Sequence, residues 1–348
     1  MRIVHTSDLH LGGKNPKSID ALKAVLRVAE SQEAELLTLG GDIFDSPADA
    51  NTLRAELRGL FHESKVQILG IPGNHDGAIF EKGFDFGFPV AAESPYEEHP
   101  FGDVSIVAVP FSNSPASEVL PSLKQAATDS KTRILLLHCT LDLGFESSNF
   151  GDESEGRYFP VSRAALASLD YDFILAGHFH SKCQTIAIDE GCRFVYPGSP
   201  FSISKKETGK RHVVLVDTER RTIEDIELPT FYFDSLSIDI WPGHERAQID
   251  QIKRWYQARE KDDCDLEVTV RGFVKYDEVK FGNQLNKAAP RAIIHNQTRD
   301  VRDVLVHPLY VRFKYILETE FPLEDRDDID RMVMGAMSSF MAGGESGR

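Results

Sequence analysis

The chain has 348 residues, of which 41% are hydrophobic and 27% charged, and its formal net charge is −16. This length suits one large domain with a smaller one appended, and the composition excludes a disordered or fibrous chain. The acidic balance argues weakly against a dominant nucleic-acid binder, because such proteins are usually basic.

The first half of the chain alternates strand-like and helix-like segments. Apolar, strand-like runs are expected at 1–7, 35–39, 66–69, 104–109, 133–138 and 172–176. Helices are expected between them at 19–30, 50–62, 118–128 and 161–168. This order predicts an α/β fold, in which the loops that follow the strands gather at the carboxyl edge of the sheet.

The second half predicts a further sheet and then a separate small unit. Short strands are expected at 184–188, 193–196, 212–216 and 222–228, and they suit a second sheet packed on the first. After Pro229-Thr230, strands are expected at 232–240, 265–271 and 291–295, with helices at 245–259 and 275–287. This pattern predicts a compact α+β unit, followed by a Met-rich helical tail from about 322.

Cysteine spacing and the absence of long apolar runs indicate where in the cell the protein is expected. The four cysteines are scattered without the spacing of a zinc site, which indicates reduced thiols and a cytoplasmic protein. No apolar stretch is long enough to cross a membrane, so no membrane association is expected. The N-terminus does not have the pattern of a signal peptide, because Arg2-Ile3-Val4-His5 leads directly into a polar motif.

Polar donors follow one expected strand after another. They form five ordered blocks: Asp8-Leu9-His10, Gly41-Asp42, Gly73-Asn74-His75-Asp76, His138 and Gly177-His178-Phe179-His180. A fold gains no stability from carboxylate and imidazole groups at so many strand ends, whereas a pair of divalent cations needs them. The set therefore points to metal-assisted phosphoester chemistry.

These donors divide between two cations. Because alternate residues of an extended strand face the same side, Asp8 and His10 can bind one ion, and His180 completes that site. Asp42 can bridge both ions by offering one carboxylate oxygen to each. The second ion takes an amide oxygen and two imidazole nitrogens from Asn74, His138 and His178. Oxygen and imidazole ligands without thiolate favour manganese or iron, with zinc as the alternative.

His75 adjoins Asn74 in the same tight turn and is therefore assigned to catalysis instead of metal binding. It can stabilise the transition state or protonate the leaving oxygen, with Asp76 as its orienting partner. Gly73 and Gly77 allow this loop to approach the phosphate closely. The ordered set as a whole predicts a phosphoester hydrolase.

Other charged residues are interpreted as structural or left open. Asp45 is interpreted as a helix-capping residue. The basic run of Lys205, Lys206, Lys210 and Arg211 is interpreted as a solvated hairpin, with contact to a phosphate backbone as the alternative. The acidic segment Asp152-Glu153-Ser154-Glu155 argues against tight binding of duplex DNA.

In these blocks the chain resembles the calcineurin-like metallophosphoesterases over residues 1–230. The resemblance implies a four-layer α/β/β/α sandwich with a dinuclear metal centre. It implies that one metal is held by Asp8, His10, Asp42 and His180. It further implies a second metal held by Asp42, Asn74, His138 and His178, with His75 as the catalytic histidine.

A narrower resemblance is to the DNA double-strand-break repair nucleases of that superfamily, including the SbcD-like exonuclease subunits. It is carried by Thr6-Ser7-Asp8-Leu9-His10-Leu11-Gly12, Gly41-Asp42-Ile43-Phe44-Asp45 and Tyr196-Pro197-Gly198-Ser199. It implies a nuclease domain at 1–230, a small α+β capping domain that helps hold DNA at 231–320, and a short helical tail at 321–348. It also implies manganese dependence, an SMC-like ATPase partner and homodimers formed through helices of the core.

Three functions compete. The leading hypothesis is a manganese-dependent DNA exo/endonuclease of double-strand-break repair, because of the flanking motifs and the capping domain. The alternative is a phosphodiesterase or phosphatase acting on a small molecule, with 231–320 as a lid, which the acidic balance favours. The third is a catalytically inactive scaffold, and the intact ligand set with His75 argues against it.

Overall fold

The computed structural model describes residues 1–80, 85–111, 114–127, 129–142, 159–181 and 183–344. The chain divides into two compact units, Met1–Phe233 and Asp234–Arg348. The acidic segment 152–155 lies outside the described residues. None of the described helices combines the length and the apolar composition that crossing a membrane requires.

The first sheet of unit 1 has five strands in the order β13-β12-β1-β2-β3. The strands β1, β2 and β3 are parallel, and β12 joins β1 in the antiparallel sense. Their bounds are Arg2–Thr6 for β1, Leu36–Leu39 for β2, Gln67–Gly70 for β3, His212–Asp217 for β12 and Thr222–Glu227 for β13. The chain thus returns to its first strand after residue 200, which brings the end of unit 1 beside its beginning.

The second sheet has six strands in the order β10-β11-β9-β6-β5-β4. Its central strands β5, β6, β9 and β11 are parallel, and the edge strands β4 and β10 are antiparallel to their neighbours. The bounds are Glu97–Phe101, Val104–Val109, Thr132–His138, Phe173–Gly177, Gln184–Ala187 and Arg193–Tyr196 for β4, β5, β6, β9, β10 and β11. A separate two-stranded ribbon pairs β7 (Thr140–Asp142) with β8 (Pro160–Ser162). The sequence had not indicated β4.

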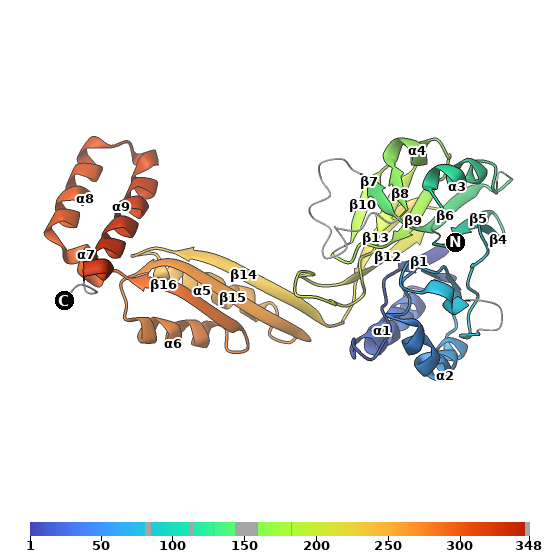
Figure 1. Cartoon of the computed structure of the whole chain (residues 1–348), viewed down its shortest axis with the longest axis horizontal. Coiled ribbons are helices and arrows are strands. Elements are labelled where there is room, and N and C mark those ends of the chain that lie inside the picture. The colour runs from blue at the N-terminus through green and yellow to red at the C-terminus, as the bar shows by residue number, and fades with distance from the viewer. Residues whose placement is uncertain (81–84, 112–113, 128, 143–158, 182, 345–348) are drawn as a thin grey trace. The chain divides into compact units, whose positions relative to one another are not determined.

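Helices cover the outer faces of the two sheets, which gives four layers (Figure 1). The first sheet carries α1 (Ser18–Ser31) and α2 (Pro47–Glu63), and the second carries α3 (Ala116–Leu123) and α4 (Arg163–Ala167), while η1 (Gly77–Phe80) is a short 3-10 turn. The predicted α/β/β/α sandwich is therefore confirmed.

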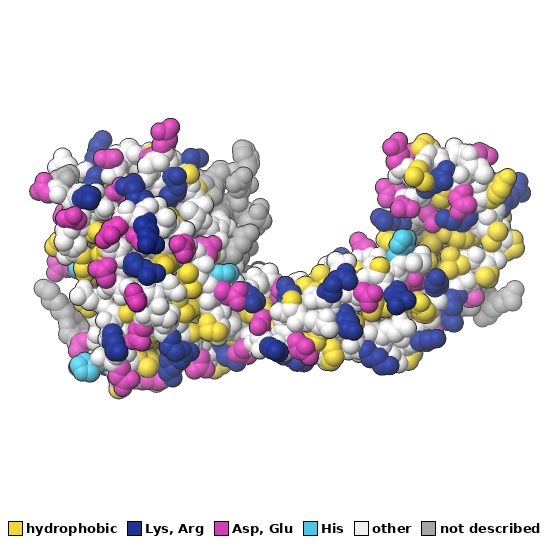
Figure 2. Space-filling model, turned by 180° about the vertical axis from the view of Figure 1, so that it is seen from behind, with side chains coloured by type: hydrophobic (Ala, Val, Ile, Leu, Met, Phe, Trp, Pro, Cys, Tyr) yellow, Lys and Arg dark blue, Asp and Glu magenta, His cyan; other side chains and the backbone are white. Residues whose placement is uncertain are grey.

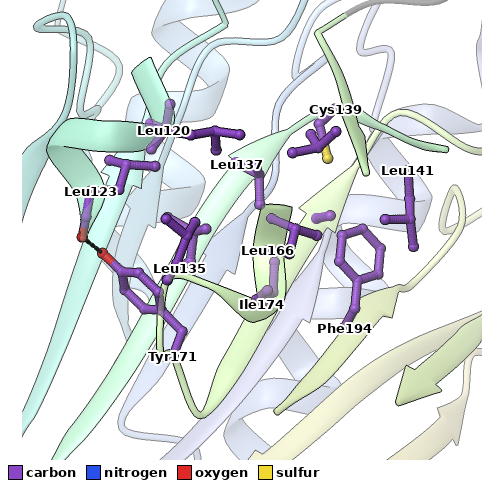
Figure 3. Packing of buried hydrophobic residues seen from close by; sticks show 14 of the residues in the cluster. Leu120, Leu123, Leu135, Leu137, Cys139, Leu141, Leu166, Tyr171, Ile174 and Phe194 are labelled. Carbon is purple, nitrogen blue, oxygen red and sulfur yellow. Dashed lines mark hydrogen bonds between the residues drawn. The ribbon is translucent and has the colours of Figure 1, made fainter. Parts of the chain in front are cut away.

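Strand β6 shows how one apolar run serves two cores. Ile134 and Leu136 face the layer between the two sheets, whereas Leu135 and Leu137 pack with the outer helices. Figure 3 shows Leu135 and Leu137 among side chains of α3, α4 and the neighbouring strands. Because both faces of the strand are buried, its sequence is continuously apolar, as in most parallel sheets.

A buried histidine joins the two sheets behind the carboxyl ends of their strands. His5 of β1 lies with Nδ1 2.9 Å from the Thr38 hydroxyl and Nε2 3.2 Å from the Ala176 carbonyl oxygen of β9. Burial lowers the pKa of His5 to about 4, so the ring is neutral at physiological pH. His5 is a structural crosslink between the layers.

Unit 2 contains a three-stranded sheet in the order β14-β15-β16, with β15 and β16 parallel. Strands β14 (Tyr232–Ile240), β15 (Cys264–Val274) and β16 (Ile293–Asp300) are connected through α5 (Glu245–Gln257) and α6 (Glu278–Ala288). The connection between the parallel neighbours β15 and β16 therefore passes through a helix, as such a pair requires.

Three further helices end unit 2: α7 (Arg302–Val306), α8 (Pro308–Glu320) and α9 (Leu323–Gly344). They share a small apolar cluster in which Val304 of α7, Tyr310 of α8 and Met334 of α9 are buried. The helical tail was expected, but α8 was not. The Met residues of α9 divide between this cluster and solvent, because Met332 is 71% exposed.

Candidate metal centre

The predicted ligands occupy backbone positions that are unusual for their residue types. Asp8, His10, Asp42 and His178 all have positive φ, at 55°, 40°, 48° and 115°. Such conformations cost on the order of 1–3 kcal/mol each and persist only where the surrounding structure imposes them. Here the loops that follow β1 and β2 are joined by a ladder of main-chain hydrogen bonds, including Asp8 N to Gly41 O (3.0 Å) and His10 N to Asp42 O (3.0 Å).

One group of donors consists of Asp8, His10 and His180, all buried. The Nε2 atoms of His10 and His180 lie 3.1 Å apart, and His180 Nε2 lies 3.7 Å from Asp8 Oδ1. Asp42 borders this group, since its Oδ2 lies 4.0 Å from His10 Nε2. The four residues assigned to one cation are thus brought together.

A second group consists of Asp8, Asp42 and His138, which are also buried. His138 Nε2 lies 3.4 Å from Asp42 Oδ2 and 2.9 Å from Asn74 Oδ1. The His178 ring lies with its centroid 5.3 Å from that of His138, and its main-chain N–H donates to the Asp8 carboxylate (3.1 Å). Asp8 therefore lies within reach of both groups, whereas its sequence position had suggested one.

Asp42 belongs to the second group and borders the first, and its carboxylate is suited to a cation. Among the residues that the structure describes, none donates a well-formed hydrogen bond to its fully buried Oδ2. Burial favours the neutral acid, but the neighbouring imidazoles, His138 above all, outweigh it and hold the pKa of Asp42 well below its usual range. A buried carboxylate oxygen of this kind, among imidazole nitrogens and an amide oxygen, fits a divalent metal ion.

His138 is held in place from its other ring nitrogen. Its Nδ1 lies 2.8 Å from the Gly40 carbonyl oxygen, which fixes the ring with Nε2 towards Asp42 and Asn74. Burial opposes protonation of this ring, but the negative charge of Asp42 raises its pKa to about 9. A cation beside Asp42 would supply the positive charge that a protonated His138 otherwise provides.

The loop after β3 brings His75 to the same place. Its main-chain N–H donates to Asp42 Oδ1 (2.8 Å), and its ring meets that of His10 edge to face at 4.8 Å between centroids. His75 is half-buried, so its side chain borders solvent. This position suits a group that meets a substrate beside the metal ligands.

Asp76 acts as a connector between loops. It is fully buried and accepts main-chain hydrogen bonds from Gly73 (2.7 Å), Phe44 (2.9 Å) and Ile43 (3.2 Å). Burial and the nearby Asp42 raise its pKa to about 7 despite these donors. Asp76 thereby fixes the His75 loop against the Asp42 loop, while its action on the His75 ring itself stays a prediction.

Sequence reasoning missed two carboxylates that face the imidazoles of predicted ligands. Asp45 Oδ1 lies 3.7 Å from His10 Nδ1, and helix α2 is capped by Ser46 instead, so the capping interpretation of Asp45 was wrong. Glu207 Oε1 lies 3.4 Å from His180 Nδ1. Asp45 could have been suspected because it closes the Gly41–Asp45 motif, but nothing in the spacing indicated Glu207.

The basic run after β11 does not act as one surface. Arg211 is 2% exposed, and its guanidinium donates to the carbonyl oxygens of Ser199 (2.9 Å), Ser181 (2.8 Å) and His180. Neither a solvated hairpin nor a phosphate contact describes this residue, so both interpretations were wrong for it. Lys205, Lys206 and Lys210 are exposed and keep both alternatives.

Gly73 permits the close approach of the His75 loop to Asp42, and this gives a testable prediction. A Cβ at this position would lie 2.2 Å from the Asp42 main-chain nitrogen and from its Oδ1. Gly73→Ala is therefore expected to separate the two loops, to lower the content of bound divalent metal, and to destabilise the fold by about 1–3 kcal/mol. Metal analysis and thermal unfolding would measure both effects.

Gly59→Ala is the matched control, because a Cβ at Gly59 in α2 meets no heavy atom within 4 Å. That substitution is expected to raise stability by about 0.5–1 kcal/mol and to leave the metal content unchanged. Native metal binding by Gly73→Ala would show that the loop contact does not position the ligands.

A sandwich of two sheets that gathers buried carboxylates and imidazoles at its strand ends is suited to metal-dependent hydrolysis of phosphoesters. Residues 1–182 match the model of the calcineurin-like phosphoesterases, and the chain belongs to that family. Members of this family typically use two divalent metal ions, and the donor groups of unit 1 supply candidate ligands for them. When bound, such ions activate water and neutralise the charge of the phosphate.

Two curated relatives and one solved structure illustrate the range of similar proteins. A probable cyclic nucleotide phosphodiesterase of Fibrobacter succinogenes is 26% identical over an alignment of 225 positions that covers 60% of this chain and 83% of the relative. The SbcD subunit of the SbcCD nuclease of Bacillus subtilis is 24% identical over an alignment of 382 positions that covers 92% of this chain and 93% of the relative. A dimetal phosphatase from Danio rerio is 10% identical with a TM-score of 0.44, over 66% of this chain and 96% of that one.

Proposed function

We propose that the protein is a manganese-dependent DNA exo/endonuclease that acts in double-strand-break repair. The observation that carries this proposal is the share of the chain over which each relative is similar. The nuclease subunit of Bacillus subtilis is similar over 92% of the chain, so the likeness extends into unit 2. The likeness to the cyclic nucleotide phosphodiesterase spans only 60% of the chain. A shared second unit favours a shared substrate class.

The proposed centre divides the ligands between two Mn²⁺ ions. One ion is held by Asp8, His10, Asp42 and His180, and the other by Asp42, Asn74, His138 and His178. The donor set of oxygen and imidazole groups without thiolate supports manganese. His75, beside both groups, supplies a proton to the leaving oxygen, and Asp76 holds its loop in place.

Unit 2 offers cationic side chains for a nucleic-acid backbone. Figure 2 shows Lys and Arg side chains along one face of its α/β part, with Asp and Glu among them. Exposed examples are Lys253 and Arg254 of α5 and Lys280 and Lys287 of α6. Contacts of this kind position a duplex without reading its sequence, which suits a capping domain of a repair nuclease.

The helical end of unit 2 presents apolar side chains that suit a protein partner. Leu309 and Tyr315 of α8 are 68% and 70% exposed, and Leu323 and Phe340 of α9 are 81% and 84% exposed. Where large exposed apolar side chains form a contiguous patch, they mark interaction surfaces. We assign this surface to an SMC-like ATPase subunit.

The four cysteines are free thiols, which supports a reducing compartment such as the cytoplasm.

Hydrolysis of a small diester is the second candidate function. The net charge of −16 and the likeness to a probable cyclic nucleotide phosphodiesterase favour it. In that case unit 2 would cover a small substrate, and the same ligands and His75 would act on it. The two functions differ in how they depend on salt, because only DNA binding releases a large counterion atmosphere.

The deciding experiment measures Mn²⁺-dependent degradation of linear duplex DNA beside hydrolysis of cyclic AMP and of bis(p-nitrophenyl) phosphate. We expect DNA degradation that is lost on chelation and that falls steeply between low and moderate salt, while hydrolysis of the small diesters changes little with salt. Robust hydrolysis of the small diesters without cleavage of DNA, even with a candidate ATPase added, would overturn the nuclease proposal.

A further inference from the structure

The segment that follows β11 contains charged and polar side chains buried beside His180. Ser199, Glu207 and Arg211 are each no more than 2% exposed. Glu and Arg are almost never buried to this degree unless they are paired, because their desolvation is expensive. These residues lie beyond 1–182, the part of the chain that matches the family model.

Glu207 is held by the segment through both carboxylate oxygens. Its Oε2 accepts hydrogen bonds from the Ile203 main chain (2.8 Å) and the Ser199 hydroxyl (3.2 Å). The other oxygen, Oε1, lies 3.4 Å from His180 Nδ1 and accepts from the Ser204 hydroxyl at 3.3 Å. The carboxylate is therefore fixed in an orientation that presents Oε1 to the imidazole.

Arg211 fixes the main chain of the same histidine. Its guanidinium donates to the carbonyl oxygens of His180 and Ser181 and, through Nε, to that of Ser199 (2.9 Å). The Ser199 hydroxyl receives a further guanidinium contact at 3.2 Å. The main chain of His180 is thus held by Arg211, while its ring is approached by Glu207.

We propose that Glu207 is a positioning residue that accepts the Nδ1–H of His180 and thereby presents Nε2 as a ligand beside Asp8 and His10. His180 Nε2 already lies 3.1 Å from His10 Nε2 and 3.7 Å from Asp8 Oδ1. A carboxylate behind a metal-binding imidazole fixes its tautomer and increases its basicity, and losing such a partner typically lowers metal affinity by about 10–100-fold. Glu207 thereby raises the metal affinity of the site that contains His180 and leaves the affinity of the other site unchanged. The inference rests on the proposed dinuclear centre.

Glu207→Gln tests the proposal, because glutamine keeps the shape of the side chain and removes its charge. In calorimetric titrations with Mn²⁺, the native chain is expected to bind two ions. The variant is expected to bind one of them at least about 10-fold more weakly and the other with native affinity. The metal-free variant is expected to melt below the native protein, because the buried Arg211 loses a neighbouring negative charge, but to stay folded at the temperature of the titration.

Glu190→Gln is the control, since Glu190 is an exposed carboxylate in the turn between β10 and β11. It is expected to bind both ions as the native chain does. Two native affinities in Glu207→Gln would overturn the inference, and so would equal losses of affinity at both sites. A native chain that binds no Mn²⁺ would overturn the proposed centre, and this inference with it.

Discussion

Replacing Asp42 by alanine is expected to leave one bound divalent ion or none and to lower phosphodiester hydrolysis by at least about 10³-fold. Asp42 is the residue on which both donor groups depend. Its Oδ2 lies 3.4 Å from His138 Nε2 and 4.0 Å from His10 Nε2, while its Oδ1 accepts the His75 main-chain N–H at 2.8 Å. One substitution therefore removes a ligand from each proposed site and releases the loop that carries His75.

Metal content by elemental analysis and hydrolysis of bis(p-nitrophenyl) phosphate would measure the two effects. Asp103→Ala is the matched control, because Asp103 is an exposed carboxylate in the turn between β4 and β5 of the same unit. That variant is expected to keep the native metal content and activity. Retention of two ions by Asp42→Ala would mean that the carboxylate does not bridge the centre.

Much of the fold could be predicted because strand periodicity and ligand position agree. The apolar runs at β1, β2, β6 and β9 each end one to three residues before a predicted ligand, and the structure places those ends together. What could not be predicted is which side chains of β6 face which core, because both of its faces are buried. Helix α8 was missed because its apolar residues, such as Leu309 and Tyr315, are largely exposed and form no single buried stripe.

A residue of the candidate site could be predicted only where its type and its position directly after a strand indicated a ligand. Asp8 was assigned to one cation from its spacing to His10, yet the loop ladder brings it within reach of His138 as well. The contact of Glu207 with His180 could not be predicted from the sequence, because it depends on how a later segment folds back onto the site. Burial of Arg211 was likewise hidden in a run that had the composition of a solvated surface.

Replacing His75 by alanine is expected to lower cleavage of an unactivated phosphodiester such as DNA by about 10²–10⁴-fold, the range typical of a lost general acid. The metal content is expected to stay at the native value, because His75 meets the centre through its main-chain N–H on Asp42 and its ring edge on His10. His62→Ala, which removes an exposed imidazole from the last turn of α2, is the control and is expected to change neither property.

The leaving group separates proton donation by His75 from a role in binding. An alkoxide needs a proton as it departs, whereas p-nitrophenolate is stable without one. If His75 supplies that proton, the loss of activity in His75→Ala is expected to be large for DNA and small for bis(p-nitrophenyl) phosphate. Equal losses for both substrates would instead mean that His75 stabilises charge on the phosphate itself. A drop in metal content would make it a ligand, and the division between binding and catalytic residues along the Gly73–Asp76 loop would have to be redrawn.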